Sequence, residues 1–261
     1  MRKEPLYIIK VGGNIIDDET NLNAFLSSFS MLKGKKILVH GGGKLATKLA
    51  ASLEIPQQMI DGRRVTDSET LKIVTMVYAG YINKNIVASL NALQCPAIGL
   101  TGADGETIKA HKRIHPSIDF GFVGDIDDIN TGFISSLLKQ ELTIVIAPIT
   151  SDKNGQLLNT NADTIAQEIA KAMSKEMETT LIYSFEKKGV LLDITNEDSV
   201  IPMLDKTTFE KLKTENSIFA GMIPKLENAF EAIHAGVNKV IIGDALQLDQ
   251  LTNGKSGTTI L

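Results

Sequence analysis

Two clusters of glycine each follow a short apolar run that is typical of a buried strand. Gly12-Gly13 follows residues 7–11, and Gly41-Gly42-Gly43 follows residues 36–40. In open parallel sheets, ligands bind beyond the carboxyl ends of the strands. Glycine leaves the backbone N–H groups bare, and a helix N-terminus behind them adds donors, so such a turn favours an anion. Either cluster alone could simply turn the chain, but two clusters after adjacent strands predict a phosphate site.

Two lysines stand where they could meet that anion. Lys10 lies inside the first apolar run, where a lysine is costly unless its ammonium group reaches water or an anion. It could snorkel to water at the strand end, but Gly12-Gly13 follows almost at once. Lys225 comes directly after Pro224, which is typical of a first helical turn. Its charge would lie beside the positive end of the helix dipole, and an anion there would remove the conflict.

The segment from Asn159 to Asp163 precedes and starts another predicted helix. Asn161 is a good N-cap, and Asp163 could simply compensate the helix dipole in the first turn. Capping does not explain Asn159 as well, so the segment is a further candidate for the site.

Other phosphate motifs fit less well. Gly254-Lys255-Ser256 matches the end of a Walker loop, but Asp249 stands where the first glycine is required. Residues 41–46 match the dinucleotide fingerprint, and Asp61 follows at about the right distance. That fingerprint also needs a second strand, for which residues 57–60 are short and poor.

Short apolar runs alternate with helical periodicity along most of the chain, which is typical of a mainly parallel sheet with helices on both faces. The predicted strands are residues 7–11, 36–40, 142–146, 181–183 and 239–242. The predicted helices are residues 45–53, 68–93, 161–174 and 224–235. Residues 101–131, rich in Gly and Asp, predict hairpins over one edge of the sheet, and Asn154-Gly155 predicts another hairpin turn. The fold class is therefore α/β, with a boundary between two halves expected near residues 174 and 175.

Composition narrows the function classes. The 261 residues suit one large or two small domains, and 43% hydrophobic with 22% charged residues excludes disorder, collagen and coiled coil. A formal net charge of -4 argues against nucleic acid as a partner, and residues 142–148, the longest apolar run, are too short to cross a membrane. The single Cys95 cannot form an intrachain disulfide, which indicates a reducing, cytoplasmic compartment. His111 and His115 have zinc-like spacing but no evident third ligand, so we expect no metal site.

Five segments together resemble the amino acid kinase family, in order along the chain from Ile8 to the C-terminus. They are residues 9–13, 40–43, 62–66, 159–163 and 221–225. The resemblance implies an open three-layer αβα sandwich. It places an acyl-amino-acid site and the dimer contact in the N-terminal half, residues 1–174, and ATP mainly in the C-terminal half, residues 175–261. Within the family, the chain is most similar to kinases of N-acylated glutamate.

The resemblance also implies roles for individual residues. Lys10 and Lys225 match two transition-state lysines, and Asp163 matches the acid that orients them. The residues that match the substrate site are Gly42, Gly43, Arg64, Asn159 and Asn161, with Arg64 on the α-carboxylate.

On the nucleotide side the match is less regular. Gly12 and Gly13 match phosphate-binding amides. Relatives often carry Ser-Asp-Val-x-Gly in a loop where this chain has a different sequence. The resemblance implies that this loop contacts the base and ribose of ATP through Glu186, Lys187, Lys188, Gly189, Val190 and Leu191. Arg63, beside Arg64, is interpreted as part of a solvated turn.

The implied reaction is phosphorylation of a γ-carboxylate by ATP, with Mg²⁺ carried by the nucleotide, to give an acyl phosphate. A glutamate carboxylate (pKa about 4.3) is ionised at neutral pH, so it needs no general base. Phosphoryl transfer depends mainly on positioning and electrostatics, which lysines and backbone amides supply. Three alternatives stay open: a sister kinase of aspartate, glutamate, carbamate or a nucleotide; an N-succinylglutamate kinase; and a dinucleotide-dependent oxidoreductase or nucleotide sensor.

Arginine-inhibited members of the family carry an extra N-terminal helix that links dimers into a hexamer. Because only Met1 to Pro5 precede the apolar run that begins at Leu6, we expect a homodimer that arginine does not inhibit.

Overall fold

A computed structural model describes the chain except for residues 1–2, 61–62, 194, 216 and 219–221. Three residues of the sequence analysis, Asp61, Gly62 and Gly221, lie outside the described residues. Within the part that is described, no helix combines the length and apolar character that crossing a bilayer requires.

The centre of the molecule is a sheet in which eight of the described strands take part, in the order β12-β14-β13-β11-β1-β2-β8-β5. Their bounds are β1 (Pro5–Val11), β2 (Lys35–His40), β5 (Ala97–Leu100), β8 (Thr143–Ile146), β11 (Glu178–Phe185), β12 (Met203–Leu204), β13 (Lys239–Asp244) and β14 (Thr258–Ile260). Pairing is parallel from β5 through β13, whereas β14 runs antiparallel to β13. All five predicted strands are present in this sheet.

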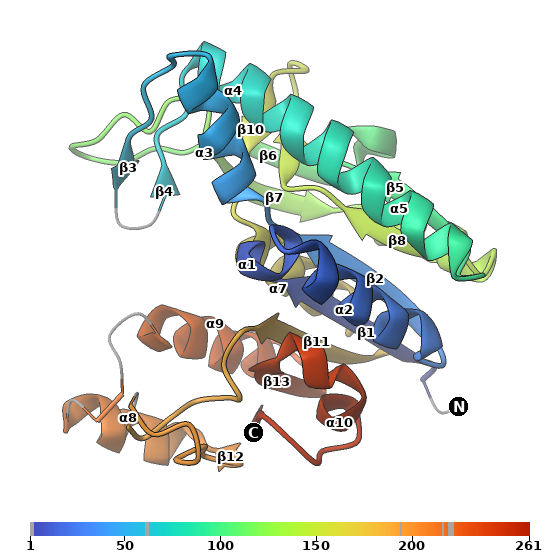
Figure 1. The fold of residues 1–261 in the computed structure, drawn as a ribbon, viewed down its shortest axis with the longest axis vertical. Helices are drawn as coiled ribbons and strands as arrows, with labels where there is room; N and C mark the ends of the chain where they lie inside the picture. The colour runs from blue at the N-terminus through green and yellow to red at the C-terminus, as the bar shows by residue number, and fades with distance from the viewer. Residues whose placement is uncertain (1–2, 61–62, 194, 216, 219–221) are drawn as a thin grey trace.

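Both faces of the sheet are buried, because side chains alternate along each strand. On β1, Leu6 and Ile8 join one core cluster, and Ile9 and Val11 join the other. The first cluster is covered by α6 (Thr131–Lys139), α7 (Ala162–Met173), α8 (Lys206–Thr214) and α9 (Ile223–His234). The second is covered by α2 (Glu19–Met31), α3 (Gly43–Ser52), α5 (Asn83–Ala92) and α10 (Leu248–Thr252). The three-layer αβα sandwich is thus confirmed (Figure 1).

Two smaller sheets lie at the β5–β8 side of the molecule (Figure 1). One has the order β10-β9-β6-β7 and is built from β6 (Ile108–Lys112), β7 (Gly124–Ile129), β9 (Ile149–Ser151) and β10 (Leu157–Asn159). β6–β7 and β9–β10 are the two antiparallel hairpins predicted for residues 101–131 and for the turn at Asn154-Gly155. The other is the short pair β3 (Met59–Ile60) and β4 (Arg63–Arg64). Because β3 pairs antiparallel outside the main sheet, the dinucleotide fingerprint lacks its second parallel strand.

The predicted helices are present, but one of them is not uniform. Residues 68–92 form α4 (Ser68–Val74), a π-helical segment η1 (Thr75–Ile82) and α5 without a break. The helices α2, α6 and α8 were not predicted from the sequence. The two halves share one sheet, since β1 pairs with β11 along its whole length. The boundary near residues 174 and 175 stays a prediction.

Candidate active site

The two glycine turns meet at the carboxyl ends of β1 and β2. A Cβ atom built on Gly41 would lie 3.7 Å from the nitrogen of Gly13, and one built on Gly13 would lie 3.9 Å from the nitrogen of Gly42. Two helices start here, α1 (Gly13–Ile16) and α3, and the first-turn N–H groups of a helix have no partner within it. Gly12 differs, because its N–H donates to the carbonyl oxygen of Ser184 at 3.1 Å. The arrangement therefore offers an anion the amides of Gly13 and of the second turn.

Gly42 tolerates no side chain. Its φ is +149°, and a Cβ atom there would lie 2.3 Å from Cδ1 of Ile82 and 3.1 Å from Cδ1 of Tyr78. Both side chains belong to η1, which therefore approaches the glycine closely. The π-helical segment thus forms one wall of the site, as such segments often do.

Lys10, Asp163 and Lys225 come together as the sequence predicted. Lys10 shares the β1 face of Leu6 and Ile8, which places its side chain on the side of α7 and α9. Its Nζ lies 2.8 Å from Oδ1 of Asp163, and Nζ of Lys225 lies 2.7 Å from Oδ2. Asp163 is in the first turn of α7, and Lys225 is in the first turn of α9 behind Pro224. One carboxylate thus holds two ammonium groups side by side.

The charges of the two lysines shift the pKa of Asp163. Burial alone raises the pKa of Asp163, but the ammonium groups of Lys10 and Lys225 outweigh it and hold that pKa well below its ordinary value. The side chains are 19%, 14% and 31% exposed, respectively, so the cluster is open to a ligand from one side. Two cations against one anion leave a net positive charge, which suits a phosphoryl group.

A cavity of about 170 Å³ lies beside the trio. It is lined by the glycine turn at residues 41–43, by Tyr78 and by Ala162 and Thr164 on either side of Asp163 in α7. Three arginines also line it, namely Arg63, Arg64 and Arg113. The interpretation of Arg63 as part of a solvated turn was wrong, because Arg63 is half-buried in β4 and faces the same cavity.

Arg64 is buried and firmly held. Its Nη2 donates to the carbonyl oxygen of Gly43 and to Oγ1 of Thr47, both at 2.9 Å, and its Nη1 donates to Oε1 of Gln57. These contacts tie the guanidinium to the start of α3, where it meets the cavity. A guanidinium fixed in this way can bind a carboxylate with a defined geometry.

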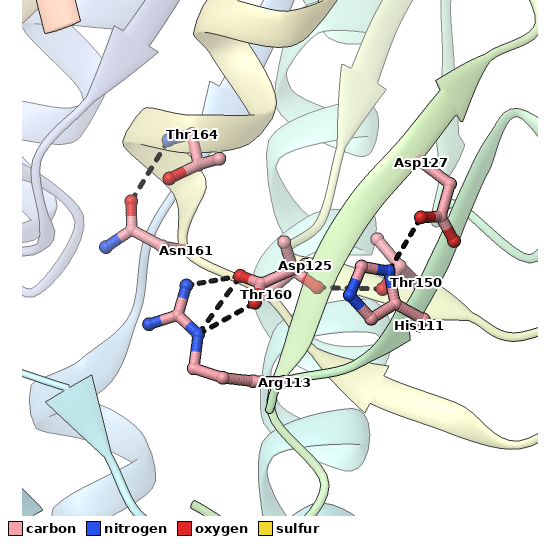
Figure 2. Close-up of polar contacts among 8 residues, drawn as sticks. All are labelled: His111, Arg113, Asp125, Asp127, Thr150, Thr160, Asn161 and Thr164. Carbon is pink, nitrogen blue, oxygen red and sulfur yellow. Dashed lines mark hydrogen bonds and ion pairs between the residues drawn. The ribbon is translucent and has the colours of Figure 1, made fainter. Parts of the chain in front are cut away.

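Asn159 and Asn161 come from the end of β10 and from the N-cap of α7. Nδ2 of Asn159 donates to Oγ1 of Thr66 at 3.0 Å. The predicted N-cap is confirmed, because Oδ1 of Asn161 accepts from the N–H of Thr164 at 3.1 Å. Figure 2 shows the amide nitrogen of Asn161 directed away from the helix, where it can donate to a ligand. Both asparagines line the cavity.

Comparison with known proteins agrees with this arrangement. Residues 5–244 match the amino acid kinase family. This chain belongs to that family. An acetylglutamate kinase from Phocaeicola vulgatus is 53% identical over 258 residues, which cover 99% of each chain. One from Cytophaga hutchinsonii is 54% identical over 251 residues, covering 96% of this chain and 95% of the relative.

Solved structures share the fold of this amino acid kinase. The structure of smu.665 from Streptococcus mutans has a TM-score of 0.79 and 27% identity, and the match covers 98% of each chain. Carbamate kinase from Giardia lamblia bound to AMP-PNP has a TM-score of 0.70 and 16% identity, covering 100% of this chain and 98% of that one.

The candidate nucleotide loop follows β11. Nδ2 of Asn14 donates to Oε1 of Glu186, which holds the loop beside α1 and the first glycine turn. Lys187 and Lys188 pair with Glu197 at 3.7 Å and Asp198 at 2.9 Å. The N–H of Val190 donates to Oγ1 of Thr258, and a Cβ atom on Gly189 would lie 2.8 Å from that same oxygen. Lys187 and Lys188 are therefore paired with acids that follow the loop in the sequence.

The two histidines singled out earlier have local partners. Nδ1 of His111 lies 2.6 Å from Oδ1 of Asp127, and the ring of His115 packs edge-on against Phe120. Across the described residues, no group of three or more His, Cys, Asp or Glu side chains could hold a metal ion.

Several residues of the site were missed from the sequence. Tyr78 lies in a mainly apolar stretch of a predicted helix, and Gln57 and Thr47, which hold Arg64, belong to no recognisable motif. Arg113 stands in a loop with no distinctive spacing. A third arginine near the cavity was therefore not foreseen.

Proposed function

We propose that this amino acid kinase transfers the γ-phosphoryl group of ATP to the γ-carboxylate of N-acetyl-L-glutamate, giving N-acetyl-L-glutamyl 5-phosphate. This is the second step of arginine biosynthesis. Curated acetylglutamate kinases that are 52–54% identical over 92–99% of this chain support the activity. Within the site, the observation that carries the proposal is Asp163 holding Lys10 and Lys225 beside the arginine-lined cavity.

For this reaction the protein must position the two reactants and stabilise negative charge on the transferring group. The γ-carboxylate is already ionised, so its oxygen attacks phosphorus, the bond to the ADP oxygen breaks, and no proton has to move. Lys10 and Lys225 stabilise the charge that spreads over the transferring group, and the amide of Gly13 and those of Gly42 and Gly43 donate to its oxygens. Asp163 holds the two ammonium groups together and in place.

Substrate and nucleotide are assigned to different parts of the site. Arg64 binds the α-carboxylate, and Asn159 and Asn161 line the pocket around the rest of the acyl amino acid. The loop from Glu186 to Leu191 binds the base and ribose, which is supported by its contact with Asn14 behind the first glycine turn. Mg²⁺ carried by the nucleotide would add positive charge on the phosphates.

An assay with hydroxylamine tests the activity directly. The protein is incubated with Mg-ATP, hydroxylamine and N-acetyl-L-glutamate, and the hydroxamate is measured. Hydroxamate forms only if an acyl phosphate is made, so its ATP-dependent appearance is expected. The Lys10→Met variant serves as the blank for contaminating kinases. No hydroxamate above that blank would refute the proposed function.

The homodimer predicted through the N-terminal half is also part of the proposal. η1 leaves Met76 and Tyr81 55% and 64% exposed, and neighbouring exposed side chains of this kind favour an interface. Light scattering is expected to give twice the chain mass of 28.3 kDa, and Tyr81→Glu is expected to shift it toward the monomer. A monomeric wild type would contradict the proposal. The cytoplasmic location inferred from Cys95 stays a prediction.

A further inference from the structure

His40 is a buried titratable residue that the proposed mechanism does not use. It is the last residue of β2, directly before the glycine turn at residues 41–43, and none of its surface is exposed. Burial lowers the pKa of His40 to about 4, so the imidazole is neutral at neutral pH. A neutral imidazole has one N–H donor and one acceptor nitrogen. The hydrogen-bond partners of the ring therefore decide which nitrogen carries the proton.

Asn83 fixes the tautomer of His40. Nδ2 of Asn83 donates to the carbonyl oxygen of Val145 at 3.0 Å and lies 3.2 Å from Nε2 of His40. On the other side of the same amide, Oδ1 accepts from Nζ of Lys84 at 3.1 Å. Because a carbonyl oxygen can only accept and an ammonium group can only donate, the amide has one orientation, with its nitrogen toward the ring. Nε2 of His40 is then the acceptor, and the proton lies on Nδ1.

The proton on Nδ1 of His40 meets the glycine turn. Nδ1 lies 2.8 Å from the carbonyl oxygen of Gly41, to which it donates. The peptide that joins Gly41 to Gly42 is trans, so its C=O and its N–H point in opposite directions. Holding the oxygen of Gly41 against the ring therefore directs the N–H of Gly42 away from the ring. A Cβ atom built on Gly13 would lie 3.9 Å from that nitrogen, which places it where the two glycine turns meet.

The peptide between Gly41 and Gly42 needs a contact that selects its orientation. Glycine on both sides leaves no Cβ atom to resist rotation of the peptide plane, and Gly42 already has a φ of +149°. Gly42 is also the N-cap of α3, so its N–H has no partner within the helix. The hydrogen bond from His40 to the oxygen of Gly41 favours one orientation over the other.

The end of η1 holds His40 and the glycine turn together. Asn83 is 1% exposed and directly follows η1, whose last residue, Ile82, approaches Gly42. Gly99 of β5 leaves the space that the amide occupies, because a Cβ atom there would lie 2.0 Å from Oδ1 of Asn83. The end of η1 therefore contacts the glycine turn directly and also through His40.

We propose that His40 is a positioning residue for phosphoryl transfer, and that Asn83 fixes its tautomer. This inference rests on the proposed function, in which the N–H of Gly42 donates to an oxygen of the transferring group. Because the imidazole is fully buried, it touches neither substrate nor nucleotide and exchanges no proton with them. It keeps one backbone donor directed at the charge that develops in the transition state, where a preorganised donor is most effective.

The competing explanation is that His40 only fills the core and braces Asn83. Two replacements separate these roles. His40→Asn places an amide nitrogen near the position of Nδ1, so it can still donate to Gly41 but does not reach Asn83. His40→Gln places an amide near the position of Nε2, so it can reach Asn83 but has no donor for Gly41. Positioning therefore predicts better function for the first variant, and bracing predicts better function for the second.

The kinetic test measures kcat and both KM values with Mg-ATP and N-acetyl-L-glutamate. We expect His40→Gln to lower kcat by about 10-fold, which corresponds to about 1.4 kcal/mol. KM for the acid and for ATP should stay within about 2-fold of wild type, because the contact acts mainly in the transition state. His40→Asn should keep kcat within about 3-fold of wild type, since it retains the donor to Gly41.

Asn91→Ala is the matched control. Asn91 lies near the other end of α5, and its Oδ1 accepts from the backbone N–H of Ala97 at 2.9 Å. The variant thus also removes a side-chain hydrogen bond to the backbone from this helix, but away from the glycine turn. It should keep wild-type kcat, and thermal melting of all variants reports what each replacement costs in stability.

Nitrogen-15 NMR tests the tautomer without any turnover. The chain has four histidines, and His111, His115 and His234 are exposed. Replacing these three by Gln leaves His40 as the source of every histidine signal, with its contacts untouched. The shifts of the two ring nitrogens show which of them carries the proton, and we expect the proton on Nδ1 at neutral pH.

The outcomes distinguish the inference from the proposed function. A proton on Nε2, or a charged ring at neutral pH, would overturn the inference even in an active kinase. The inference is also overturned if His40→Asn does not fold, or if its kcat is no higher than that of His40→Gln. A wild type that forms no acyl phosphate would refute the proposed function, and the positioning role with it.

Discussion

Replacing Asp163 by Asn separates catalysis from helix capping. The N-cap of α7 is Asn161, so the exchange removes charge from the site and leaves the cap intact. Both ammonium groups touch the one carboxylate at 2.8 and 2.7 Å. They therefore lie within about 8 Å of each other, and without the carboxylate their mutual repulsion of about 2 kcal/mol at an effective dielectric constant of 20 is no longer offset by attraction. We expect Asp163→Asn to lose about that much free energy of unfolding.

The effect on catalysis should be much larger than this loss of stability implies. Without the carboxylate, Lys10 and Lys225 move apart and no longer meet the transferring phosphoryl group together. We expect kcat to fall by about 10²-fold or more, as for the loss of a transition-state donor. Hydroxamate formation and thermal melting, measured on one preparation, report the two effects.

Glu69→Gln is the matched control. Glu69 is also an acid in a first helical turn that pairs with a lysine, Lys72 at 2.7 Å, but the pair is exposed and lies on α4. It should keep wild-type kcat. A folded Asp163→Asn variant with kcat close to wild type would refute the assigned role of Asp163.

The stability that Asp163 contributes should depend on pH. Its pKa is depressed in the folded protein, so its contribution is present above the unfolded value of about 3.9 and is lost as the pH falls through the lower folded value. The difference in free energy of unfolding between wild type and Asp163→Asn should therefore be constant from about pH 5 to 8 and shrink below about pH 4. Urea unfolding at pH 7 and pH 3.5 measures it, and an equal difference at both pH values would contradict the ion pairs.

Four further variants test the rest of the site. Lys10→Met or Lys225→Met should each lower kcat by about 10²-fold or more, and near wild-type turnover would exclude that lysine from the transition state. Arg64→Lys keeps the charge but loses the fork, so KM for the acylglutamate should rise by about 10-fold while KM for ATP stays unchanged; the opposite pattern would place Arg64 at the nucleotide. Gly42→Ala should lower both Tm and activity, because its Cβ would lie 2.3 Å from a side chain of η1, and an unchanged Tm would show that the wall can move.

The Lys10–Asp163–Lys225 trio was predictable because each member stands at an element boundary that the sequence marks. The apolar run around Lys10 defines a strand, and its alternation fixes the face that the lysine uses. Asn161 and Pro224 mark two helix starts, which place Asp163 and Lys225 in first turns. Since the carboxyl ends of parallel strands and the N-termini of the following helices share one edge, these residues had to converge. The family resemblance supplied their roles.

The supporting residues could not be predicted in the same way. Thr47 and Gln57 contact Arg64 only in the folded chain. No hydrophobic periodicity or capping residue in the sequence indicates these contacts. The π-helical turn at η1 also leaves no trace, since residues 75–82 are apolar on every side and suit an α-helix equally well. Its role becomes evident from the structure, where Tyr78 and Ile82 of η1 approach Gly42.

Arg113 shows most clearly why charge must be considered after folding. In the sequence it is one of several basic residues in a polar stretch, where a solvated surface is the ordinary explanation. The β6–β7 hairpin turns it toward the cavity and pairs it with Asp125, twelve residues away. Asp125 lines the same cavity, so the charge of Arg113 is balanced within the wall of the site.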